Sequence, residues 1–143
     1  MSLKTEIFFF FPNTNISLAN RTNLKKFIGY IFKQENKKIL FLNCIFCTDS
    51  DLLKKNRKYL KHDFYTDIIT FRLSEKGPIQ AEIYISIDRV RINAIKLGVS
   101  VKSELYRVIF HGVLHLCEYR DKTNVEKVTM RKKEDFYLSL YQN

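Results

Sequence analysis

The sequence predicts an α+β fold, with a small mixed β-sheet of about four strands packed by about five helices. The chain has 143 residues, 45% of them hydrophobic, which is enough for one domain with a buried core. Strand-like and helix-like segments alternate in the first half, whereas helical periodicity dominates the second half. No linker, repeat or low-complexity segment divides residues 1–143, so we expect a single domain.

The first half of the chain is expected to form strands and helices in turn. Residues 4–11 are rich in Phe and Ile and form a strand that ends at Pro12. Residues 20–36 begin with a capping residue and carry apolar side chains at helical spacing. Residues 38–47 form a second, largely buried strand, and residues 49–60 form a short helix.

Two strands and a helix follow. Residues 66–73 and 80–87 have the composition of strands and are separated by Gly77-Pro78, a turn sequence. Asp88 is expected to cap the next helix, which ends at Gly98.

Positive charge strongly exceeds negative charge. The chain has 25 Lys and Arg against 15 Asp and Glu, a net charge of +10. The excess is clustered in two runs, the second within an amphipathic helix expected over residues 124–141. The runs comprise Lys54, Lys55, Arg57, Lys58 and Lys61, and Lys127, Arg131, Lys132 and Lys133. Such clusters attract polyanions, so a nucleic acid is the natural partner, although lysine-rich surfaces also serve solubility alone.

The three cysteines indicate a reducing compartment, because an odd number in a chain of this size is not a disulfide framework. Cys44 and Cys47 have C-x-x-C spacing, but residues three apart on a strand face opposite sides. We therefore expect buried thiols rather than a redox or metal pair. The apolar run at residues 8–11, between Glu6 and Pro12, is too short for a signal peptide or a membrane span. A cytoplasmic protein without membrane contact is expected.

The most informative residues are His111 and His115, on a helix expected over residues 102–117. Four residues apart on a helix, the two imidazoles lie about 40° apart around the axis and about 6 Å apart along it, so both reach one metal ion. Asp121 follows just after the helix must end, and a turn would return its carboxylate to the same ion. Three protein ligands with one open position are typical of a catalytic zinc site.

Two other interpretations of this motif fit the sequence less well. Histidines on an apolar helix often pack in the core without binding metal, but two of the three histidines in this chain stand at ligand spacing. Zinc proteases share the spacing, but Gly112 occupies the position of their general-base glutamate, which argues against peptide hydrolysis.

The sequence around the motif resembles the YbeY family, which are metal-dependent endoribonucleases of ribosomal RNA maturation. Residues 111–121, His-Gly-Val-Leu-His-Leu-Cys-Glu-Tyr-Arg-Asp, are similar to the family signature His-Gly-x-Leu-His-Leu-x-Gly-Tyr-Asp-His. Thr-Asp-Ile-Ile-Thr-Phe at 66–71 resembles the strand Thr-Asp-Val-Leu-Ser-Phe, and Ala-Glu-Ile-Tyr-Ile-Ser at 81–86 resembles Gly-Asp-Ile-x-Ile-Ser. The resemblance covers about residues 50–135, with further matches at Asn93-Ala94, Glu104-Leu105 and Met130. It implies a small mixed sheet packed by helices, with the metal motif at a cleft.

Three positions depart from the family pattern. Asp121 stands for the third metal histidine, which makes the ligand set His₂Asp and opens the site to divalent metals other than zinc. Glu118 replaces a glycine that ends the helix, at an expected left-handed position. Leu60 replaces an arginine.

The resemblance, the metal motif and the basic runs together predict a zinc-dependent endoribonuclease. Its substrate would be single-stranded RNA in ribosomal RNA maturation and ribosome quality control, with the ribosome or ribosomal proteins as partners. The nucleophile, either water or the 2′-hydroxyl of the RNA, stays open. The replacement at Leu60 favours an alternative, a non-catalytic RNA-binding assembly factor with a structural metal. A metallohydrolase for a non-nucleic substrate is the third candidate, which the positive charge disfavours.

Five residues outside the metal motif are candidates for the site. Arg57, Lys58 and Lys61 would clamp substrate phosphate in place of the missing arginine, unless they form only a solvated helix face. Glu118 is a candidate general base, or a helix-end side chain that faces water. Glu104 lies one heptad before the first histidine. It would hydrogen-bond a ligand imidazole, or serve only as a first-turn acid that complements the helix dipole.

Overall fold

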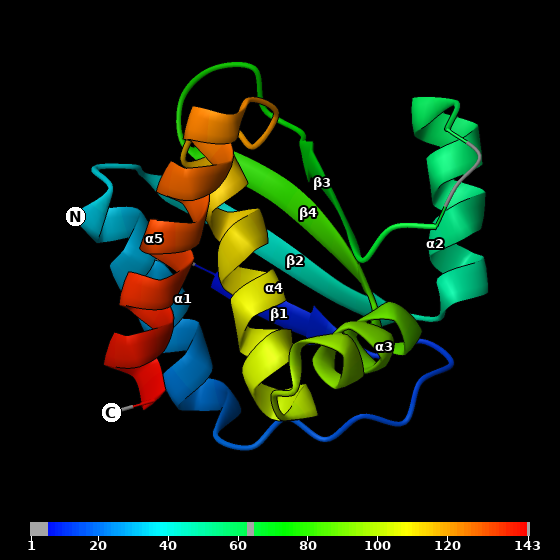
Figure 1. Cartoon of the computed structure of the whole chain (residues 1–143). Helices are drawn as coiled ribbons and strands as arrows, with labels where there is room; N and C mark the ends of the chain where they lie inside the picture. The colour runs from blue at the N-terminus through cyan, green and yellow to red at the C-terminus, as the bar shows by residue number, and fades with distance from the viewer. Residues whose placement is uncertain (1–5, 63–64, 143) are drawn as a thin grey trace.

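The computed structural model describes residues 6–62 and 65–142, which form one mixed sheet with helices on both sides (Figure 1). The elements are β1 (Glu6–Phe10), α1 (Arg21–Gln34), β2 (Ile39–Cys47), α2 (Asp49–Lys55), a π-helical turn η1 (Asn56–Leu60), β3 (Ile68–Arg72), β4 (Ile79–Ser86), α3 (Ile87–Leu97), α4 (Val101–Leu116) and α5 (Asn124–Gln142). The α+β fold predicted from the sequence is confirmed. Among the helices that the structure describes, none has the length and apolar character needed to cross a bilayer.

The sheet has the strand order β1-β2-β4-β3. The first three strands are parallel to one another, and β3 runs antiparallel to β4. The β3–β4 connection turns at Gly77, whose φ of 79° is the left-handed conformation that glycine adopts readily. Because β3 is an edge strand, it pairs with β4 along one edge, and its other edge forms no strand pairing among the described residues.

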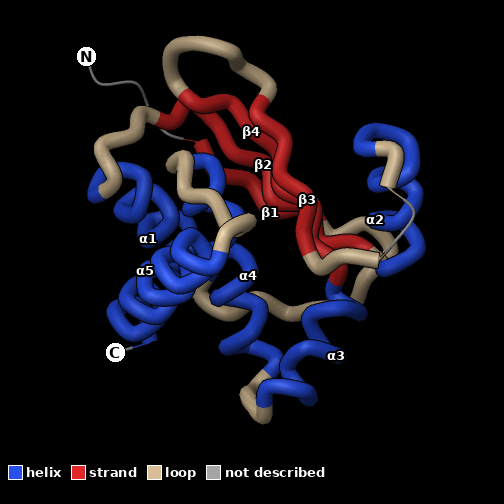
Figure 2. Tube along the Cα trace, turned by 45° about the horizontal axis from the view of Figure 1, so that its top comes forward, coloured by secondary structure: helices blue, strands red, loops and turns tan. Residues whose placement is uncertain are grey.

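The two faces of the sheet are buried against different helices (Figure 2). On one face, side chains of β2 and β4 join the main core with α1, α4 and α5; these are Leu42, Cys44, Phe46, Ala81, Ile83 and Ile85. On the other face, Cys47 and Ile69 form a small cluster with Leu52 of α2. Cys44 and Cys47 therefore face opposite sides and are buried thiols without a disulfide, as predicted, and Cys117 is also a buried free thiol.

The start of α3 differs in detail from the sequence prediction. Asp88 as the cap of α3 is wrong, because the strand ends one residue earlier and the hydroxyl of Ser86 accepts from the Arg89 N–H at 3.1 Å. The Asp88 carboxylate instead accepts from the backbone N–H of Asp49 at 2.8 Å, which joins α3 to α2. Gly98 ends α3 in the left-handed conformation, as predicted.

The short helix expected over residues 49–60 is α-helical only in its first part. It continues as the π-helical turn η1 and ends at Lys61, whose φ is 56°. The carbonyl of Asn56 accepts backbone N–H groups from both Lys61 and His62, which closes the turn. Single π turns inside helices are frequent at functional sites.

Gly112 allows α4 to lie unusually close to the sheet. A Cβ atom at this position would lie 2.6 Å from Cδ1 of Ile68 on β3 and 3.0 Å from Cδ1 of Ile83 on β4. Real Cβ atoms do not tolerate the shorter distance, so only glycine fits without movement of its neighbours. The close approach places the flanking His111 and His115 beside edge strand β3.

Candidate metal centre

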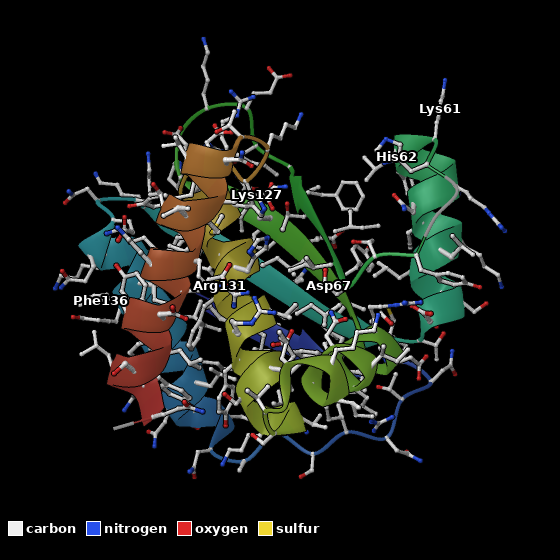
Figure 3. All side chains as sticks on the ribbon, viewed as in Figure 1. Lys61, His62, Asp67, Lys127, Arg131 and Phe136 are labelled. Carbon is white, nitrogen blue, oxygen red and sulfur yellow. The ribbon has the colours of Figure 1, made fainter. Side chains whose placement is uncertain are left out.

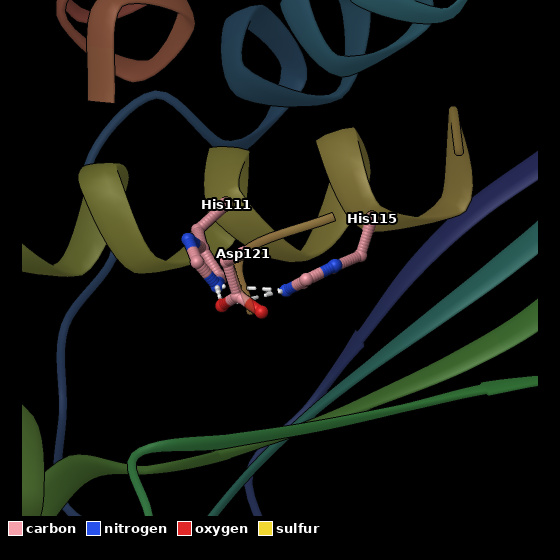
Figure 4. A group of neighbouring side chains, drawn as sticks. All are labelled: His111, His115 and Asp121. Atoms are coloured by element: carbon pink, nitrogen blue, oxygen red, sulfur yellow. Dashed lines mark hydrogen bonds and ion pairs between the residues drawn. The ribbon is translucent and has the colours of Figure 1, made fainter. Parts of the chain in front are cut away.

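His111, His115 and Asp121 converge as the sequence spacing predicted (Figure 4). The Nε2 atoms of the two imidazoles are 2.9 Å apart. Oδ2 of Asp121 lies 3.3 Å from Nε2 of His111 and 3.2 Å from Nε2 of His115. The three donor atoms fall within 4.8 Å of one another, so one ion can contact all of them. We call these three residues the metal triad.

Both imidazoles are held through the nitrogen that does not face the triad. Nδ1 of His115 lies 2.9 Å from the carbonyl oxygen of Tyr119, and Nδ1 of His111 lies 2.5 Å from Oε2 of Glu134. A carbonyl oxygen only accepts, so Nδ1 of His115 carries a proton, and Nε2 is the ring nitrogen that faces the triad. Ligand histidines in metal sites are oriented by this same kind of contact.

The turn that returns Asp121 to the helix is set by the end of α4. Glu118 adopts a left-handed conformation with φ of 77°, as predicted for this position. Its N–H donates to the carbonyl of His115 at 2.9 Å, and the Tyr119 N–H donates to the carbonyl of Leu114 at 3.0 Å. These two bonds form a Schellman motif, which reverses the chain direction at a helix end. A side chain with a Cβ adopts this conformation at a cost of about 1–2 kcal/mol.

The same loop is closed on its far side by the start of α5. The Glu126 N–H donates to Oγ1 of Thr123 at 3.1 Å, and the Thr123 N–H donates to Oε1 of Glu126 at 2.9 Å. This reciprocal pair is a capping box. Asp121 thus lies in a short loop whose two ends are both fixed by hydrogen bonds.

A buried ion-pair chain supports His111 from α5 and from the first turn of α4. Arg107 donates through Nη1 to Oε1 of Glu134 at 2.9 Å and through Nε to Oε1 of Glu104 at 2.8 Å. Both carboxylates are almost fully buried, at 1% exposure for Glu104 and 2% for Glu134. The carboxylate that contacts the ligand imidazole therefore belongs to Glu134, and Glu104 contacts Arg107 instead.

The charges in this chain reinforce one another. Burial raises the pKa of Glu134, but His111 and Arg107 outweigh it and hold the pKa below its usual value. Burial lowers the pKa of His111, but the hydrogen bond and charge of Glu134 outweigh it and raise the pKa. An ionised Glu134 favours positive charge at His111, either as a proton on the imidazole or as a metal ion bound to it. A proton and a metal ion compete for the imidazole, so metal binding would release protons.

Tyr119 connects the loop to α1. Its hydroxyl donates to Oε1 of Glu35 at 2.6 Å, and the Tyr137 hydroxyl donates to the other oxygen of the same carboxylate. Lys133 lies over the Tyr119 ring and 3.4 Å from Glu35. Because the Tyr119 carbonyl orients His115, this contact links the metal triad to the packing of α1 against α5.

The triad forms one wall of a cleft of about 300 Å³ that crosses the edge of β3. Its other walls come from η1, from described residues between η1 and β3, and from β3 itself; Asn56, Leu60, His62, Thr66 and Asp67 are among them. Within the described ranges, the metal-binding group has three members and no fourth protein ligand. A site of three ligands beside a cleft keeps a position for water or substrate.

None of the other residues predicted for the site is among the described residues that line this cleft. Arg57, Lys58 and Lys61 are exposed and are not among the described residues that line it, whereas Leu60 is. Their predicted contact with substrate phosphate stays a prediction. Glu118 is exposed and pairs with Lys37, with 3.0 Å between Oε2 and Nζ.

Comparison with known proteins supports the assignment of the motifs. The sequence profile of the family described as Endoribonuclease YbeY matches residues 12–142. A protein of Cytophaga hutchinsonii named Endoribonuclease YbeY is 53% identical over 135 residues, covering 94% of both chains. The protein of the same name from Amoebophilus asiaticus is 45% identical and covers 94% of this chain and 92% of its own.

The fold is also that of a solved structure. A protein from Thermotoga maritima, known from a solution structure, aligns with a TM-score of 0.65 at 25% identity. The alignment covers 96% of this chain and 89% of the Thermotoga chain. The sequence matches extend well before residue 50, where the resemblance on motifs began. Fold, metal triad and sequence agree, and the chain belongs to the YbeY family of endoribonucleases.

Proposed function

We propose that the protein is a metal-dependent endoribonuclease that cleaves single-stranded RNA, with precursor ribosomal RNA in the cytoplasm as its substrate. The observation that carries the proposal is the metal triad in the wall of a cleft, with three ligands and both imidazoles oriented through Nδ1. Family membership supports RNA as the substrate. Ribosomal RNA and ribosomal partners are the setting that the motif resemblance implies.

His111, His115 and Asp121 would hold the ion, and we infer that it is zinc, because two imidazoles and a carboxylate with one open position suit catalytic zinc. When bound, a divalent ion polarises a phosphoryl oxygen and lowers the pKa of a water molecule, and both effects favour phosphodiester cleavage. Glu134 and the Tyr119 carbonyl keep the two Nε2 atoms directed at the ion.

The substrate would meet a polar cleft with positively charged side chains on the surface around it. Asp67 lies in the cleft and is a carboxylate that can accept a proton from the attacking group. Exposed cations stand on η1 and on the first half of α5, including Arg57 and Lys127. The helix α2 that leads into η1 and the helix α5 lie on different sides of β3 (Figure 1). They would hold the flanking phosphates by charge, since neutralised phosphates release counterions.

The experiment is a cleavage assay with chelated and reloaded protein. The metal is removed, and zinc, manganese and magnesium are restored one at a time. Each form is incubated with a labelled single-stranded RNA, with the same strand as DNA, and with the RNA duplex. The proposal predicts cleavage of the single-stranded RNA alone and only after a metal is restored, fastest with zinc. Cleavage that is equal in the chelated protein would contradict it.

A second candidate function is favoured by Leu60, the apolar residue in the cleft where the family has an arginine. In that case the protein binds RNA during ribosome assembly and uses the metal for structure. It predicts tight, salt-sensitive RNA binding and a large fall in melting temperature on chelation, without cleavage by any reloaded form. The assay above separates the two candidates directly.

A further inference from the structure

All three histidines of the chain line the same cleft. His111 and His115 belong to the metal triad, and His62 reaches the cleft from the segment that follows η1. His62 is remote from the other two in sequence, and the helix that precedes it lies on the other side of edge strand β3 from α4 (Figure 1). The metal triad gives a role to two of the histidines and leaves His62 without one.

Among the described residues that line the cleft, none is a lysine or an arginine, the side chains that most often bind phosphate. This holds although the chain has 25 Lys and Arg. Leu60 provides an apolar side chain there. Outside the metal triad, His62 is the one described lining residue whose side chain can carry a positive charge.

The backbone fixes the direction in which His62 leaves the helix. The carbonyl of Asn56 accepts from the N–H of His62 at 3.2 Å, and it also accepts from the N–H of Lys61. Lys61 is left-handed, with φ of 56°. Figure 3 shows the consequence: Lys61 extends outward from the end of the helix, and His62 lies on the side toward the sheet.

We propose that His62 binds the scissile phosphate of the RNA, donating a ring N–H to a non-bridging phosphate oxygen while the metal triad acts from its own wall of the cleft. An imidazole has at least one N–H in either charge state, so the contact needs no particular protonation state. The bond is charge-assisted in both states, because the phosphate oxygen that accepts it is anionic. This inference rests on the proposed function for the choice of RNA as the ligand.

The test compares His62→Ala and His62→Lys with the wild type, all in the metal-loaded form. His62→Ala removes the donor, and His62→Lys restores a cationic donor at the same position. Lys96→Ala is the control, because it removes a positive charge from an exposed position on α3 outside the cleft. Two quantities are measured: the kinetics of cleavage of a single-stranded RNA, and the Kd of uridine 3′-monophosphate.

We expect His62→Ala to raise the Kd of the nucleotide and to lower kcat/KM by about tenfold each, the size of one charge-assisted hydrogen bond. His62→Lys should recover most of both losses, and Lys96→Ala should change neither by more than about twofold. Histidine ring signals in NMR give a direct readout, because the chain has only three histidines. The His62 signal should shift during titration with the nucleotide.

Two failures are distinguishable. If the wild type cleaves RNA and His62→Ala matches it in both kcat/KM and nucleotide Kd, the inference about His62 is wrong and the proposed function stands. If the wild type does not cleave, the proposed function fails, and the nucleotide Kd still decides whether His62 binds phosphate. A loss in His62→Ala that His62→Lys does not restore would also overturn the phosphate contact.

Discussion

Glu134 on α5 contacts the imidazole of His111 on α4, with 2.5 Å between Oε2 and Nδ1. The other oxygen of this buried carboxylate accepts from Nη1 of Arg107 at 2.9 Å. The orientation of one metal ligand therefore depends on how α5 packs against α4. Residues with no contact to the ion are expected to affect its binding.

Glu134→Gln is expected to weaken metal binding by about 10–100-fold, the usual effect of losing a carboxylate partner of a ligand imidazole. The neutral amide favours positive charge at His111 less than the carboxylate does. Metal affinity is measured by competition with a chromophoric chelator. Asp135→Asn is the matched control, because it removes the same charge from the next, exposed residue of α5. Equal weakening by both variants would point to a general charge effect instead.

Gly112→Ala should lower the free energy of unfolding. The overpacked contact costs about 1–3 kcal/mol, and the better helix propensity of alanine offsets about 1 kcal/mol of that loss. The added Cβ would meet Ile68 and Ile83 of the sheet. Gly29→Ala in α1 is the control, because no atom lies within 4 Å of its added Cβ. It should raise stability by about 0.5–1 kcal/mol. Urea unfolding of both variants measures the difference, and stabilisation of both would show that α4 does not need the close approach.

Glu35 is expected to make stability depend on acid pH. Burial raises its pKa, but hydrogen bonds from Tyr119 and Tyr137 and the charge of Lys133 outweigh it, so the folded-state pKa lies below the ordinary value of 4.5. A carboxyl with a depressed pKa contributes stability that is present above its unfolded-state pKa and lost as the pH falls through the folded-state value.

Glu35→Gln should therefore destabilise the protein at neutral pH, by about 1–3 kcal/mol. It should also flatten the loss of stability below about pH 4.5. The free energy of unfolding is measured in urea across this range. Glu75→Gln serves as the control, since it removes one carboxylate from the exposed β3–β4 turn. If Glu35→Gln lost stability at acid pH as steeply as the wild type, Glu35 would not be the group responsible for that loss.

The three thiols are expected to be inert in the folded protein. Burial raises the pKa of Cys44, Cys47 and Cys117, each to about 12. Since the thiolate is the reactive form, alkylation at mildly alkaline pH should be slow in the native state and complete in urea. Mass spectrometry counts the modified thiols. Rapid modification of any one of them in the native protein would show that its surroundings open readily.

Much of the architecture follows from local patterns in the sequence. Helix α1 was predicted from apolar side chains at helical spacing and strand β2 from its run of apolar residues, and their ends fall within a few residues of the prediction. The cap of α3 was mispredicted because Ser86 and Asp88 are both capping residue types. Only the point where β4 stops hydrogen bonding selects Ser86.

The metal triad was predictable because its spacing is local. His111 and His115 share a helix, and Asp121 follows in the loop directly after that helix. Glu134 was not predicted, because its contact with His111 arises only when α5 packs on α4. Its one signal in the sequence was a buried-face position on the last helix, shared by Met130 and Tyr137.

His62 was also not predicted, for the same reason. It stands within a basic run, and the sequence does not show which of the run's side chains turn toward the sheet. The left-handed Lys61 makes that choice. The local sequence spacing predicts the metal triad. Which further polar residues lie beside the triad depends on contacts between segments that are distant in sequence.

His115→Ala decides whether RNA cleavage by this protein depends on the metal triad. Wild type and variant are purified anaerobically, their metal content per chain is measured, and both are assayed on the same single-stranded RNA. The account predicts about one metal ion per wild-type chain, and loss of both metal and cleavage in the variant. Cleavage that survives unchanged in His115→Ala would contradict it, because the activity would then come from elsewhere.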